Sequence, residues 1–492
     1  MERRATLEDL GLTPRAGQGA TITGLAVDSR AVRPGFLFAA LPGTRVHGAT
    51  FIPQVLEAGA AAILTDAKGA ELADVALSGA SAAVIVTEDP REALARAAAL
   101  WFGAQPATMV AVTGTNGKTS VATFARQIWE LLGQAAINVG TTGIEGAWTA
   151  PSSHTTPDAI TLQSVLAQAA QAGVTHAAME ASSHGLDQRR LDGVRLMAAG
   201  FTNLTQDHLD YHHTMEAYFQ AKAQLFTRLL PPEGTAVINL NGAMGPEMAA
   251  IAADHGHAVI GVGSGPEADL RLLAHRYDAT GQDLRFSWNG KTHLARLNLI
   301  GGFQSENVAV AAGLCLAAGA RAEDVFDALP RLTGVRGRMQ LAATRKNGAA
   351  VFVDYAHTPD AIETALKALR PHVMGRLIIA FGAGGDRDRT KRPLMGAAAS
   401  AHADLCYVTD DNPRSEDAAT IRAAILAACP AAIEVGDRAE AILRAADALQ
   451  PGDALLIAGK GHETGQTIAG QVYPFDDVEQ ASLAVAALDG VI

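Results

Sequence analysis

The chain has 492 residues, and this length predicts roughly three domains of ordinary size. Its formal net charge of -12 and its pI near 5.7 argue against nucleic acid or an anionic membrane as the main partner, so we expect neither. With 48% hydrophobic residues, 49 glycines and only 5% aromatic residues, the composition favours an α/β enzyme in which helices and strands pack closely.

The first part of the chain alternates short β-like runs with helical runs between about residues 22 and 86, which predicts a small α/β domain. Asp28-Ser29-Arg30 follows the first run, and a polar loop with two glycines spans residues 42–48. Either loop alone is typical of ordinary turn chemistry, but two in one small domain favour a ligand crevice. A helix predicted over about 90–103, closed by Gly103, puts the first domain boundary after residue 104.

Residues 110–120 predict a phosphate-binding loop. An apolar run turns through Gly114 and Gly117 into Lys118, after which Thr119 and Ser120 open an amphipathic segment. The glycines allow close approach of the backbone, and successive N–H groups and the helix N-terminus face the anion. In such a loop the lysine reaches the outer phosphates and the hydroxyl of Thr119 can ligate Mg²⁺.

Two further β-like runs lead into polar loops. The run over 175–179 is followed by Glu180, and the run over 196–201 leads into a loop, 202–213, that contains three histidines and two aspartates. Ligands of open parallel sheets gather at the carboxyl ends of strands, so we expect Glu180 at the ligand crevice. His208 of the second loop is a candidate magnesium ligand.

A lysine interrupts the apolar stripe of the helix predicted over 214–230. Lys222 follows the i, i+3, i+4, i+7 spacing of the apolar residues and should therefore face inward. One interpretation is a lysine whose ammonium group reaches solvent at the end of its aliphatic chain. The other is a desolvated lysine of lowered pKa, whose carbamate would be an anionic ligand for magnesium.

A β-hairpin is predicted around the Asn289-Gly290 turn, and a helix follows that includes Asn307. Asn307 serves either as a helix-start residue or as a nucleotide contact. Near residues 333–340 the pattern changes, which predicts a second domain boundary after residue 334.

Repeated strand-then-helix patterns from residue 335 to residue 492 predict a doubly wound domain. Four of its strands end in polar loops of unusual composition, at 354–360, 382–389, 410–414 and 459–463. The crevice rule predicts that all four meet at one sheet edge, which favours a binding site over a merely solvated face.

Cys315, Cys406 and Cys429 are widely spaced, which predicts neither a disulfide framework nor a zinc site. We expect all three in the core of a cytoplasmic protein. The N-terminus leads into no apolar stretch of the signal-peptide kind, and the longest apolar run, 308–320, is too short to span a bilayer.

Taken in order, these motifs resemble those of the Mur ligases over nearly the whole chain. The residues that carry the resemblance are Gly114-Thr115-Asn116-Gly117-Lys118-Thr119, Met179-Glu180-Ala181-Ser182-Ser183-His184, the His208 loop, Lys222, Gly337-Arg338-Met339, Asp354-Tyr355-Ala356-His357-Thr358-Pro359 and Asp411-Asn412-Pro413-Arg414. The resemblance implies an α/β protein of three domains: a UDP-sugar-binding domain (1–104), a central ATP-binding P-loop domain with a mainly parallel sheet (105–334) and a Rossmann-like amino-acid-binding domain (335–492).

The resemblance further implies an ATP-dependent amide ligase of peptidoglycan precursor synthesis that works through an acyl phosphate. Its small-molecule partners would be ATP, Mg²⁺, UDP-N-acetylmuramoyl-L-Ala-D-Glu and meso-diaminopimelate, and we expect a monomer. Both steps concentrate negative charge, which lysine, arginine and magnesium stabilise without a protein nucleophile. His208 and His357 are candidate bases for the amine.

Carried over to this sequence, the resemblance assigns four groups of residues. The catalytic and metal-binding group is Lys118, Thr119, Glu180, His208 and Lys222 as a carbamate. The ATP-binding group is Gly114, Thr115, Asn116, Gly117, Lys118, Thr119, Ser120, Asn307, Arg338, Asp354 and His357. The UDP-muramoyl-dipeptide group is Val27, Ser29, Thr44, Arg45, Val46, His154, Thr155, Thr156, Ser182, Gln188 and Arg190. The diaminopimelate group is Arg387, Asp411, Asn412, Pro413, Arg414, Gly459 and Glu463.

Arg414 favours diaminopimelate over lysine, because a guanidinium offers a bidentate site to the carboxylate at the far end of that amino acid. Lysine would place an ammonium against it. The alternatives within the ligase class are a lysine-adding enzyme and folylpolyglutamate synthetase, which lacks the module around Asp28-Ser29-Arg30. A P-loop kinase or NTPase of other specificity is the alternative outside it.

Overall fold

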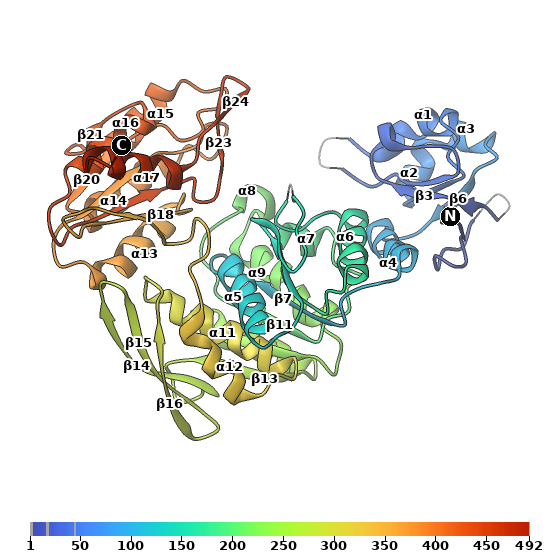
Figure 1. Ribbon diagram of the computed structural model, residues 1–492. Helices are drawn as coiled ribbons and strands as arrows, with labels where there is room; N and C mark the ends of the chain where they lie inside the picture. Colours follow the sequence, from blue (N-terminus) through green and yellow to red (C-terminus); the bar gives the residue numbers. More distant parts are fainter. Residues whose placement is uncertain (1–2, 16–18, 44–45, 153, 492) are drawn as a thin grey trace.

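The computed structural model describes residues 3–15, 19–43, 46–152 and 154–491, which form three α/β bodies arranged in a row (Figure 1). The N-terminal body lies at one end of the row and the C-terminal body at the other end. Between them lies the central body, which contains the predicted phosphate-binding loop. The predicted α/β class and division into three domains are confirmed, and the two boundary residues stay predictions. None of the helices within the described ranges combines the length and apolar character that a membrane crossing needs.

The described residues of the N-terminal body form a four-stranded parallel sheet of order β3-β4-β5-β6 beside a two-stranded ribbon, β1-β2. β4 and β5 are almost wholly buried apolar runs, as parallel strands covered on both faces usually are. The strands are β1 (Ala5–Thr6), β2 (Thr21–Ile22), β3 (Gly24–Ala26), β4 (Phe36–Ala39), β5 (Ala62–Thr65) and β6 (Ala83–Val86). The helices are α1 (Ile52–Glu57), α2 (Ala67–Leu72), α3 (Asp74–Ser78) and α4 (Pro90–Phe102).

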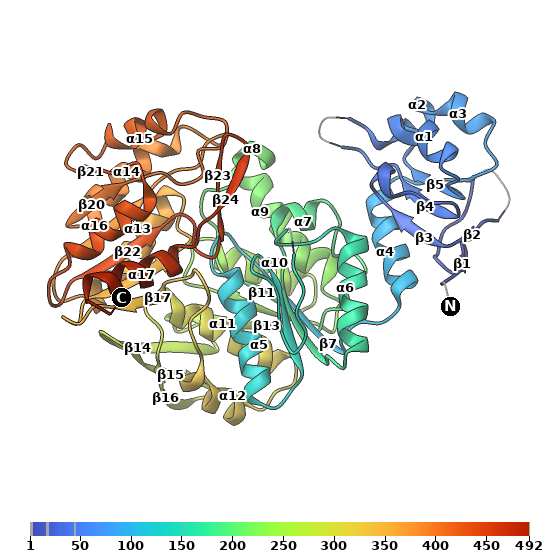
Figure 2. The ribbon, with the colours of Figure 1, turned by 45° about the horizontal axis from the view of Figure 1, so that its top comes forward.

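Helix α4 belongs to two bodies at once (Figure 2). Asp89 caps its N-terminus by accepting from the N–H groups of Arg91 and Glu92, both at 3.1 Å. Leu94, Ala97 and Trp101 pack into the N-terminal core, and Ile160 of the central body packs against the same cluster. The predicted boundary after residue 104 thus falls at the end of a helix that both bodies share.

The described residues of the central body form a ten-stranded sheet of order β16-β15-β14-β13-β12-β11-β7-β10-β8-β9. The strands from β14 through β8 in this order are parallel, and β9, β15 and β16 are antiparallel to their neighbours. The strands are β7 (Thr108–Thr113), β8 (Ala136–Gly140), β9 (Gly143–Gly146), β10 (His176–Glu180), β11 (Ala198–Phe201), β12 (Thr235–Asn239), β13 (Ala258–Gly263), β14 (Leu270–Asp278), β15 (Gly281–Trp288) and β16 (Lys291–Leu297). The helices are α5 (Lys118–Leu131), α6 (Ala159–Gln171), α7 (Ser183–Asp187), α8 (Leu209–His212), α9 (Met215–Gln224), α10 (Gly245–Asp254), α11 (Phe303–Ala317) and α12 (Ala322–Ala328).

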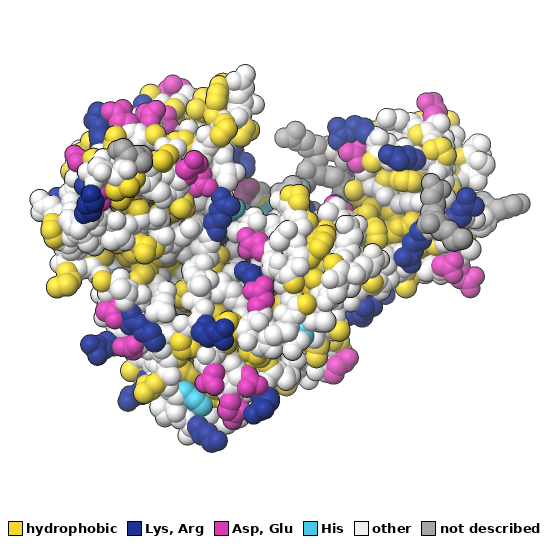
Figure 3. Space-filling view, in the orientation of Figure 1, with side chains coloured by type: hydrophobic (Ala, Val, Ile, Leu, Met, Phe, Trp, Pro, Cys, Tyr) yellow, Lys and Arg dark blue, Asp and Glu magenta, His cyan; other side chains and the backbone are white. Residues whose placement is uncertain are grey.

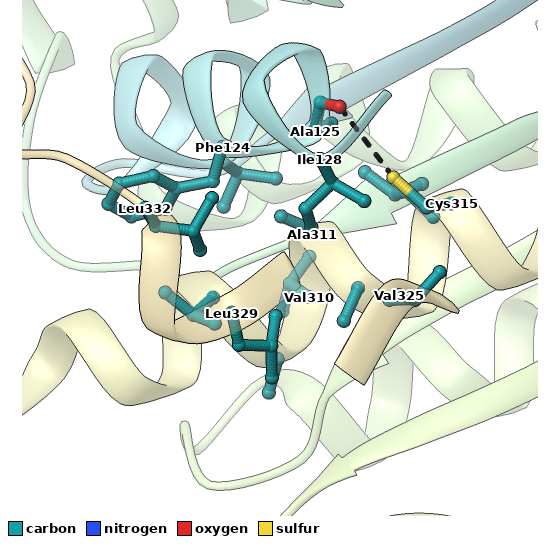
Figure 4. Packing of buried hydrophobic residues seen from close by; sticks show 14 of the residues in the cluster. Phe124, Ala125, Ile128, Val310, Ala311, Cys315, Val325, Leu329 and Leu332 are labelled. Carbon is teal, nitrogen blue, oxygen red and sulfur yellow. Dashed lines mark hydrogen bonds between the residues drawn. The ribbon is translucent and has the colours of Figure 1, made fainter. Parts of the chain in front are cut away.

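Strand β7 lies near the middle of this sheet and is buried on both faces. Val110 and Val112 pack in the cluster formed by α5, α11 and α12, part of which Figure 4 shows from close by. Met109 and Ala111 point to the opposite cluster, under α6, α9 and α10. Because alternate side chains of this strand pack in two cores, the start of the loop that follows it is anchored at the sheet edge.

The helix predicted over 214–230 is not one regular helix. Helix α9 ends at Gln224 and continues as a π-helix (Leu225–Leu229), in which the N–H of Leu230 donates to the carbonyl of Leu225 at 2.9 Å. Arg228 explains the wider turn, because its guanidinium bonds to Asp192 and donates to the carbonyl of Leu186 at 2.8 Å.

The described residues of the C-terminal body form a six-stranded sheet of order β17-β18-β22-β19-β20-β21, parallel apart from β17. Helices α13, α14 and α15 cover one face, and α16 and α17 cover the other, as a doubly wound fold requires. The strands are β17 (Gln340–Thr344), β18 (Ala350–Asp354), β19 (Leu377–Phe381), β20 (Leu405–Val408), β21 (Ile433–Glu434) and β22 (Ala454–Ala458), with a separate hairpin of β23 (Gly465–Ile468) and β24 (Gln471–Pro474). The helices are α13 (Pro359–Leu369), α14 (Lys391–His402), α15 (Ala418–Leu426), α16 (Arg438–Asp447) and α17 (Asp477–Leu488).

One buried histidine joins the C-terminal body to the central body. His372 has its Nδ1 2.6 Å from the carbonyl oxygen of Asp278, at the end of β14. Its Nε2 accepts from the N–H of Gly301 at 3.1 Å. The ring of Tyr277 lies edge-on to the imidazole, with centroids 5.1 Å apart.

All three cysteines, Cys315, Cys406 and Cys429, are free and buried, as predicted. The thiol of Cys315 donates to the carbonyl of Ala125 in the core drawn in Figure 4.

Candidate active site

The predicted phosphate-binding loop lies between β7 and α5. Gly114 and Gly117 have positive φ angles of 147° and 90°, which side-chain-bearing residues rarely adopt. A β-carbon on Gly114 would lie 1.9 Å from the hydroxyl of Thr202, and one on Gly117 would lie 2.4 Å from the side-chain oxygen of Asn307. Both positions therefore require glycine, for conformation and for space.

The ammonium groups of Lys118 and Lys222 share one backbone carbonyl. Each donates to the carbonyl oxygen of Gly114 at 2.8 Å, and Lys118 also donates to the carbonyl oxygen of Thr115 at 2.8 Å. Burial lowers the pKa of Lys118, and it lowers that of Lys222 well below its ordinary value, with the charge of Lys118 as a second cause.

Lys222 faces inward and does not reach solvent. Its side chain is 1% exposed, and the ammonium nitrogen lies 4.3 Å from the centre of the Tyr218 ring. No carboxylate among the described residues forms an ion pair with it. Burial and a lowered pKa are the properties that the second interpretation of the sequence requires, whereas the solvent-reaching interpretation is excluded.

Glu180 ends strand β10, next to β7 in the sheet, and is buried. Its Oε1 accepts from the N–H of Thr141 at 2.8 Å, and its Oε2 accepts from the hydroxyl of Thr141 at 3.2 Å. A β-carbon on Gly140 would lie 2.0 Å from the carboxylate, so glycine there makes room for it. The hydroxyl of Thr155 lies 2.9 Å from that of Thr141 and extends this polar surface.

His208 follows strand β11 and has a left-handed backbone, with φ of 53°. Its Nε2 lies 3.4 Å from the carboxylate of Asp207. Burial lowers the pKa of His208 to about 4, which makes the ring neutral at neutral pH. The rings of His184 and Tyr218 lie edge-on to it, with centroid distances of 4.8 and 6.1 Å.

These groups line a cavity of about 390 Å³, here called the P-loop cavity, between the central and C-terminal bodies. Figure 3 shows the surface hollowed where these bodies meet, with basic and histidine side chains inside. The predicted residues that line it are Thr115, Asn116, Gly117, Lys118, Thr119, Ser120, Thr155, Glu180, Ser182, His208, Lys222, Asn307, Arg338, Asp354 and His357. Gly114 is absent from the lining, and its carbonyl instead holds the two lysines.

The C-terminal body contributes one wall of this cavity. The guanidinium of Arg338 stacks 4.5 Å from the centre of the Tyr355 ring and donates to the hydroxyl of Thr119 at 3.3 Å. Asp354 accepts from the N–H groups of Met339 at 2.6 Å and Ala356 at 2.8 Å, while burial raises its pKa. Arg338 thus connects the two bodies directly across the phosphate-binding loop.

One end of the P-loop cavity is apolar, and sequence reasoning missed it. Phe303 opens α11, and Ala361 and Ala365 lie one turn apart on α13. An apolar end beside a phosphate-binding loop suits the flat base of a nucleotide. The sequence offers little signal for these residues, because an apolar residue on a helix is typical of ordinary core.

A second and larger cavity of about 1210 Å³, here called the C-terminal cavity, adjoins the first. All four predicted strand-end loops of the C-terminal body contribute to it, which confirms that they meet at one sheet edge. Six of the predicted diaminopimelate residues line it, namely Arg387, Asp411, Asn412, Arg414, Gly459 and Glu463, whereas Pro413 does not. The lining also includes Lys391 and Asp207, which the sequence did not single out.

Arg414 is held in a fixed conformation in this cavity. Its φ is 52°, and its N–H donates to the carbonyl of Thr467 at 3.0 Å. The guanidinium donates through Nη1 to the carbonyl of Gly385 at 2.7 Å. The donors that this bond leaves free are available to an anionic group in the cavity.

The residues predicted for the UDP-muramoyl-dipeptide are spread more widely. Arg190 connects Thr156 and Gln188, since it donates to the carbonyl of Thr156 at 2.6 Å and to the Gln188 side chain at 2.8 Å. They and His154 do not line either cavity.

Val27, Ser29 and Val46 lie in the N-terminal body, away from both cavities. The side chains of Val27 and Val46 are exposed. Thr44 and Arg45 fall outside the described residues.

The oxygens available in the P-loop cavity suit magnesium. Mg²⁺ prefers hard oxygen ligands and usually keeps water and phosphate oxygens in its coordination shell. The hydroxyl of Thr119 and the carboxylate of Glu180 are of that kind, and both line the cavity. Within the described ranges, no group of three or more His, Cys, Asp or Glu side chains is arranged to hold a metal ion by itself.

Family models match each of the three bodies. The model "Mur ligase family, catalytic domain" matches residues 21–102, "Mur ligase middle domain" matches residues 112–315, and "Mur ligase, glutamate ligase domain" matches residues 337–461.

Individual proteins match over almost the whole chain. A protein from Caulobacter vibrioides named UDP-N-acetylmuramoyl-L-alanyl-D-glutamate--2,6-diaminopimelate ligase is 51% identical, over 95% of this chain and 96% of its own. A protein of the same name from Bradyrhizobium diazoefficiens is 50% identical over 95% of each chain. A solved structure of a ligase with this name has a TM-score of 0.70 at 34% identity and covers 99% of each chain.

Proposed function

Since this chain belongs to the Mur ligase family, we propose that it is an ATP-dependent amide ligase that adds meso-diaminopimelate to UDP-N-acetylmuramoyl-L-Ala-D-Glu. The product is a precursor of peptidoglycan. ATP and a UDP-linked substrate are cytoplasmic metabolites, so the proposed location is the cytoplasm, and the proposed active form is a monomer.

The observation that carries the proposal is the common wall of the two cavities. Asp207, His208, Tyr355, His357, Thr358 and Asp360 line both of them. The P-loop cavity, proposed for ATP, and the C-terminal cavity, proposed for the amino acid, therefore open onto each other. This arrangement suits a reaction in which an activated carboxyl group, formed on one side, is attacked by an amine from the other.

In the first step the γ-carboxylate of D-Glu attacks the γ-phosphorus of ATP, and ADP leaves from the opposite side. The N–H groups of the loop ending at Gly117, with Lys118, neutralise the phosphate charge. Arg338 supports the same charge from the C-terminal body. In the second step the amine of the amino acid attacks the acyl phosphate, and phosphate leaves as the amide forms.

Magnesium, when bound, neutralises the charge that develops on the transferred phosphoryl group. Thr119, Glu180, His208 and the carbamate of Lys222 are the proposed ligands. For the proton released by the amine, His357 is a candidate acceptor, and His208 is the other candidate only where it does not bind the metal, because burial lowers the pKa of both rings and keeps them neutral. The Nδ1 of His357 lies 3.0 Å from the carbonyl of Tyr355, which leaves its Nε2 as the acceptor.

The choice of amino acid rests on Arg414. Its guanidinium is fixed at the C-terminal cavity, where a second carboxylate would find a bidentate partner. The ammonium group of lysine would meet like charge at the same place. This residue supports diaminopimelate over lysine as the substrate.

Phosphate release from ATP, measured with UDP-N-acetylmuramoyl-L-Ala-D-Glu and one of meso-diaminopimelate, L-lysine or no amine, tests the proposal. We expect release with diaminopimelate alone. In Arg414→Ala the KM for diaminopimelate should rise at least about tenfold while the KM for ATP stays near the wild-type value. Equal use of lysine would overturn the specificity argument, and equal release without any amine would overturn the proposed ligase reaction.

A further inference from the structure

A second buried lysine lies behind the C-terminal cavity, and no step described above uses it. Lys460 follows strand β22 in the loop between Gly459 and Glu463, and its side chain is 0% exposed. It lines neither the P-loop cavity nor the C-terminal cavity. A buried ammonium group is costly unless each of its protons finds an acceptor, so the contacts of Lys460 show what it holds.

The ammonium group of Lys460 has one acceptor for each of its protons. It donates to Oδ1 of Asn412 at 3.3 Å, to Oε2 of Glu463 at 3.2 Å and to the carbonyl of Gly465 at 2.5 Å. These acceptors belong to the loop after β20, to the loop after β22 and to the start of β23. One side chain thus joins three segments that meet at the wall of the C-terminal cavity.

Lys460 helps to set which way the Asn412 amide points. Since an ammonium group can only donate, it selects the oxygen of that amide and turns the nitrogen away. The nitrogen then donates to Oε2 of Glu463 at 2.8 Å, and the oxygen also accepts from the N–H of Thr467 at 2.9 Å. Without the ammonium group, the Asn412 oxygen would keep only the N–H of Thr467 as a donor, and Oε2 of Glu463 would keep only the Asn412 amide, so both side chains would be held less firmly.

Glu463 is oriented by the same contacts. Its Oε2 accepts hydrogen bonds from Lys460 and Asn412, while its Oε1 accepts no hydrogen bond from any residue that the structure describes. The side chain lines the C-terminal cavity. A carboxylate held by one oxygen and free at the other is prepared for an ammonium group of a ligand.

The hairpin β23-β24 connects the contacts of Lys460 to Arg414. The N–H of Arg414 donates to the carbonyl of Thr467, and the carbonyl of Arg414 accepts from the N–H of Ala469 at 2.7 Å. Lys460 fixes the start of this hairpin through Gly465 and its middle through Asn412 and Thr467. The backbone of Arg414 is therefore tied to the same anchor as Glu463.

We propose that Lys460 is a positioning residue for the amino-acid substrate, which acts by fixing Asn412, Glu463 and the hairpin that holds Arg414. This inference rests on the proposed function, since it names a residue that prepares the same site for its second substrate. A buried lysine with a purely structural role would stabilise the C-terminal body and leave the recognition of all substrates equally intact.

The test is the variant Lys460→Met, which keeps the length and apolar stem of the side chain and removes its charge and donors. We expect the KM for meso-diaminopimelate to rise at least about tenfold, because the groups that align it lose their positions. The KM values for ATP and for UDP-N-acetylmuramoyl-L-Ala-D-Glu should stay within about twofold of wild type, since Lys460 touches neither proposed site. In Lys460→Gln, which retains a donor, we expect an intermediate KM for diaminopimelate.

A matched control is Arg345→Met in the same body. Arg345 is a partly buried cation, which donates to Asp489 at 2.8 Å and to the carbonyl of Ala446 at 2.6 Å, away from both cavities. We expect it to lower the unfolding temperature without changing any KM. Lys460→Gln decides the question if Lys460→Met does not fold.

The outcomes separate the two proposals. Absence of diaminopimelate-dependent phosphate release in the wild type would overturn the proposed function, and this inference with it. Normal wild-type activity, together with an unchanged KM for diaminopimelate in the lysine variants or an equal rise in all three KM values, would overturn the role of Lys460 alone. A selective rise confined to diaminopimelate would support it.

Discussion

At the scale of single residues, Lys222 shows how position decides chemistry. Its place in an apolar stripe is visible in the sequence, and the structure shows the ammonium group buried beside Lys118 with no carboxylate partner among the described residues. A second positive charge so close would be unfavourable, whereas a carbamate would turn Lys222 into an anion facing Lys118. The same modification would supply a ligand for magnesium.

We therefore predict that Lys222 carries a carbamate in the active protein. Addition of ¹³C-bicarbonate should give a carbamate carbon signal by NMR, and that signal should disappear in Lys222→Met. Phosphate release by Lys222→Met should fall at least about a hundredfold, because a charged ligand near the transferred group is lost. An active wild-type protein without the carbamate signal would contradict the prediction.

At the scale of elements, a buried ion pair holds the strand ends that carry the C-terminal loops. Arg438 begins α16 and Asp477 begins α17. The guanidinium donates two hydrogen bonds to the carboxylate, each 2.7 Å long, and both side chains are 0% exposed. Arg438 also donates to the carbonyls of Asp410 at 3.2 Å and Ala458 at 3.0 Å. Two helices and two strand ends therefore share one guanidinium.

Arg438→Met should destabilise the C-terminal body by about 3–5 kcal/mol, because Asp477 would remain as an unpaired buried charge. The double variant Arg438→Met, Asp477→Leu should recover a large part of that loss, since well-packed apolar residues can replace a buried pair. Urea unfolding, followed for the transition of this body, measures both. Equal stability of the single and double variants would show that the pair is not coupled.

Local patterns in the sequence were enough to predict most helices and strands and the polar side chains at the ends of strands. Glycines, a lysine and hydroxyls between a strand and a helix are a local signal, which is why the loop ending at Gly117 could be predicted. Lys222 could be placed by periodicity alone. The π-helix could not, because it depends on contacts of Arg228 with Asp192 and Leu186, which are remote in the chain.

Surfaces assembled from different bodies lay beyond sequence reasoning. Phe303 and Ala361 come together only when the C-terminal body docks on the central one, and each alone is typical of helix core. Lys460 is a similar case, since its role is evident only from the three segments that meet at its ammonium group. Contacts between segments that are remote in the chain produce no local pattern in the sequence from which they could be predicted.

At the scale of the whole molecule, one contact that docks the C-terminal body on the central body involves a titratable group, His372. Its Nε2 must be unprotonated to accept from the N–H of Gly301, while Nδ1 donates to the carbonyl of Asp278. Burial lowers the pKa of His372 in the folded protein. Its contribution to stability is therefore present above the ordinary histidine pKa of about 6.5 and is lost as the pH falls below it.

We predict that this docking weakens on acidification in a way that His372→Gln does not reproduce, because glutamine offers both a donor group and an acceptor without titrating. Between about pH 7.5 and about pH 5.5 the wild-type unfolding midpoint should fall by about 2 °C or more beyond that of the variant. Calorimetry at a series of pH values measures the difference. Parallel pH profiles of the two proteins would contradict the prediction.

Helix α4 limits where this molecule can be divided by protein engineering. A shortened chain that begins at residue 105 would lose the helix and uncover Ile160 and the surface around Gly193. Gly193 packs closely against the helix, since a β-carbon added to it would lie 2.7 Å from the β-carbon of Ala99. A chain that begins at residue 89 would keep the cap and the helix but expose Leu94 and Trp101. Either cut leaves an apolar surface, so a separately expressed catalytic portion will need α4 retained with its N-terminal-facing side chains replaced by polar ones.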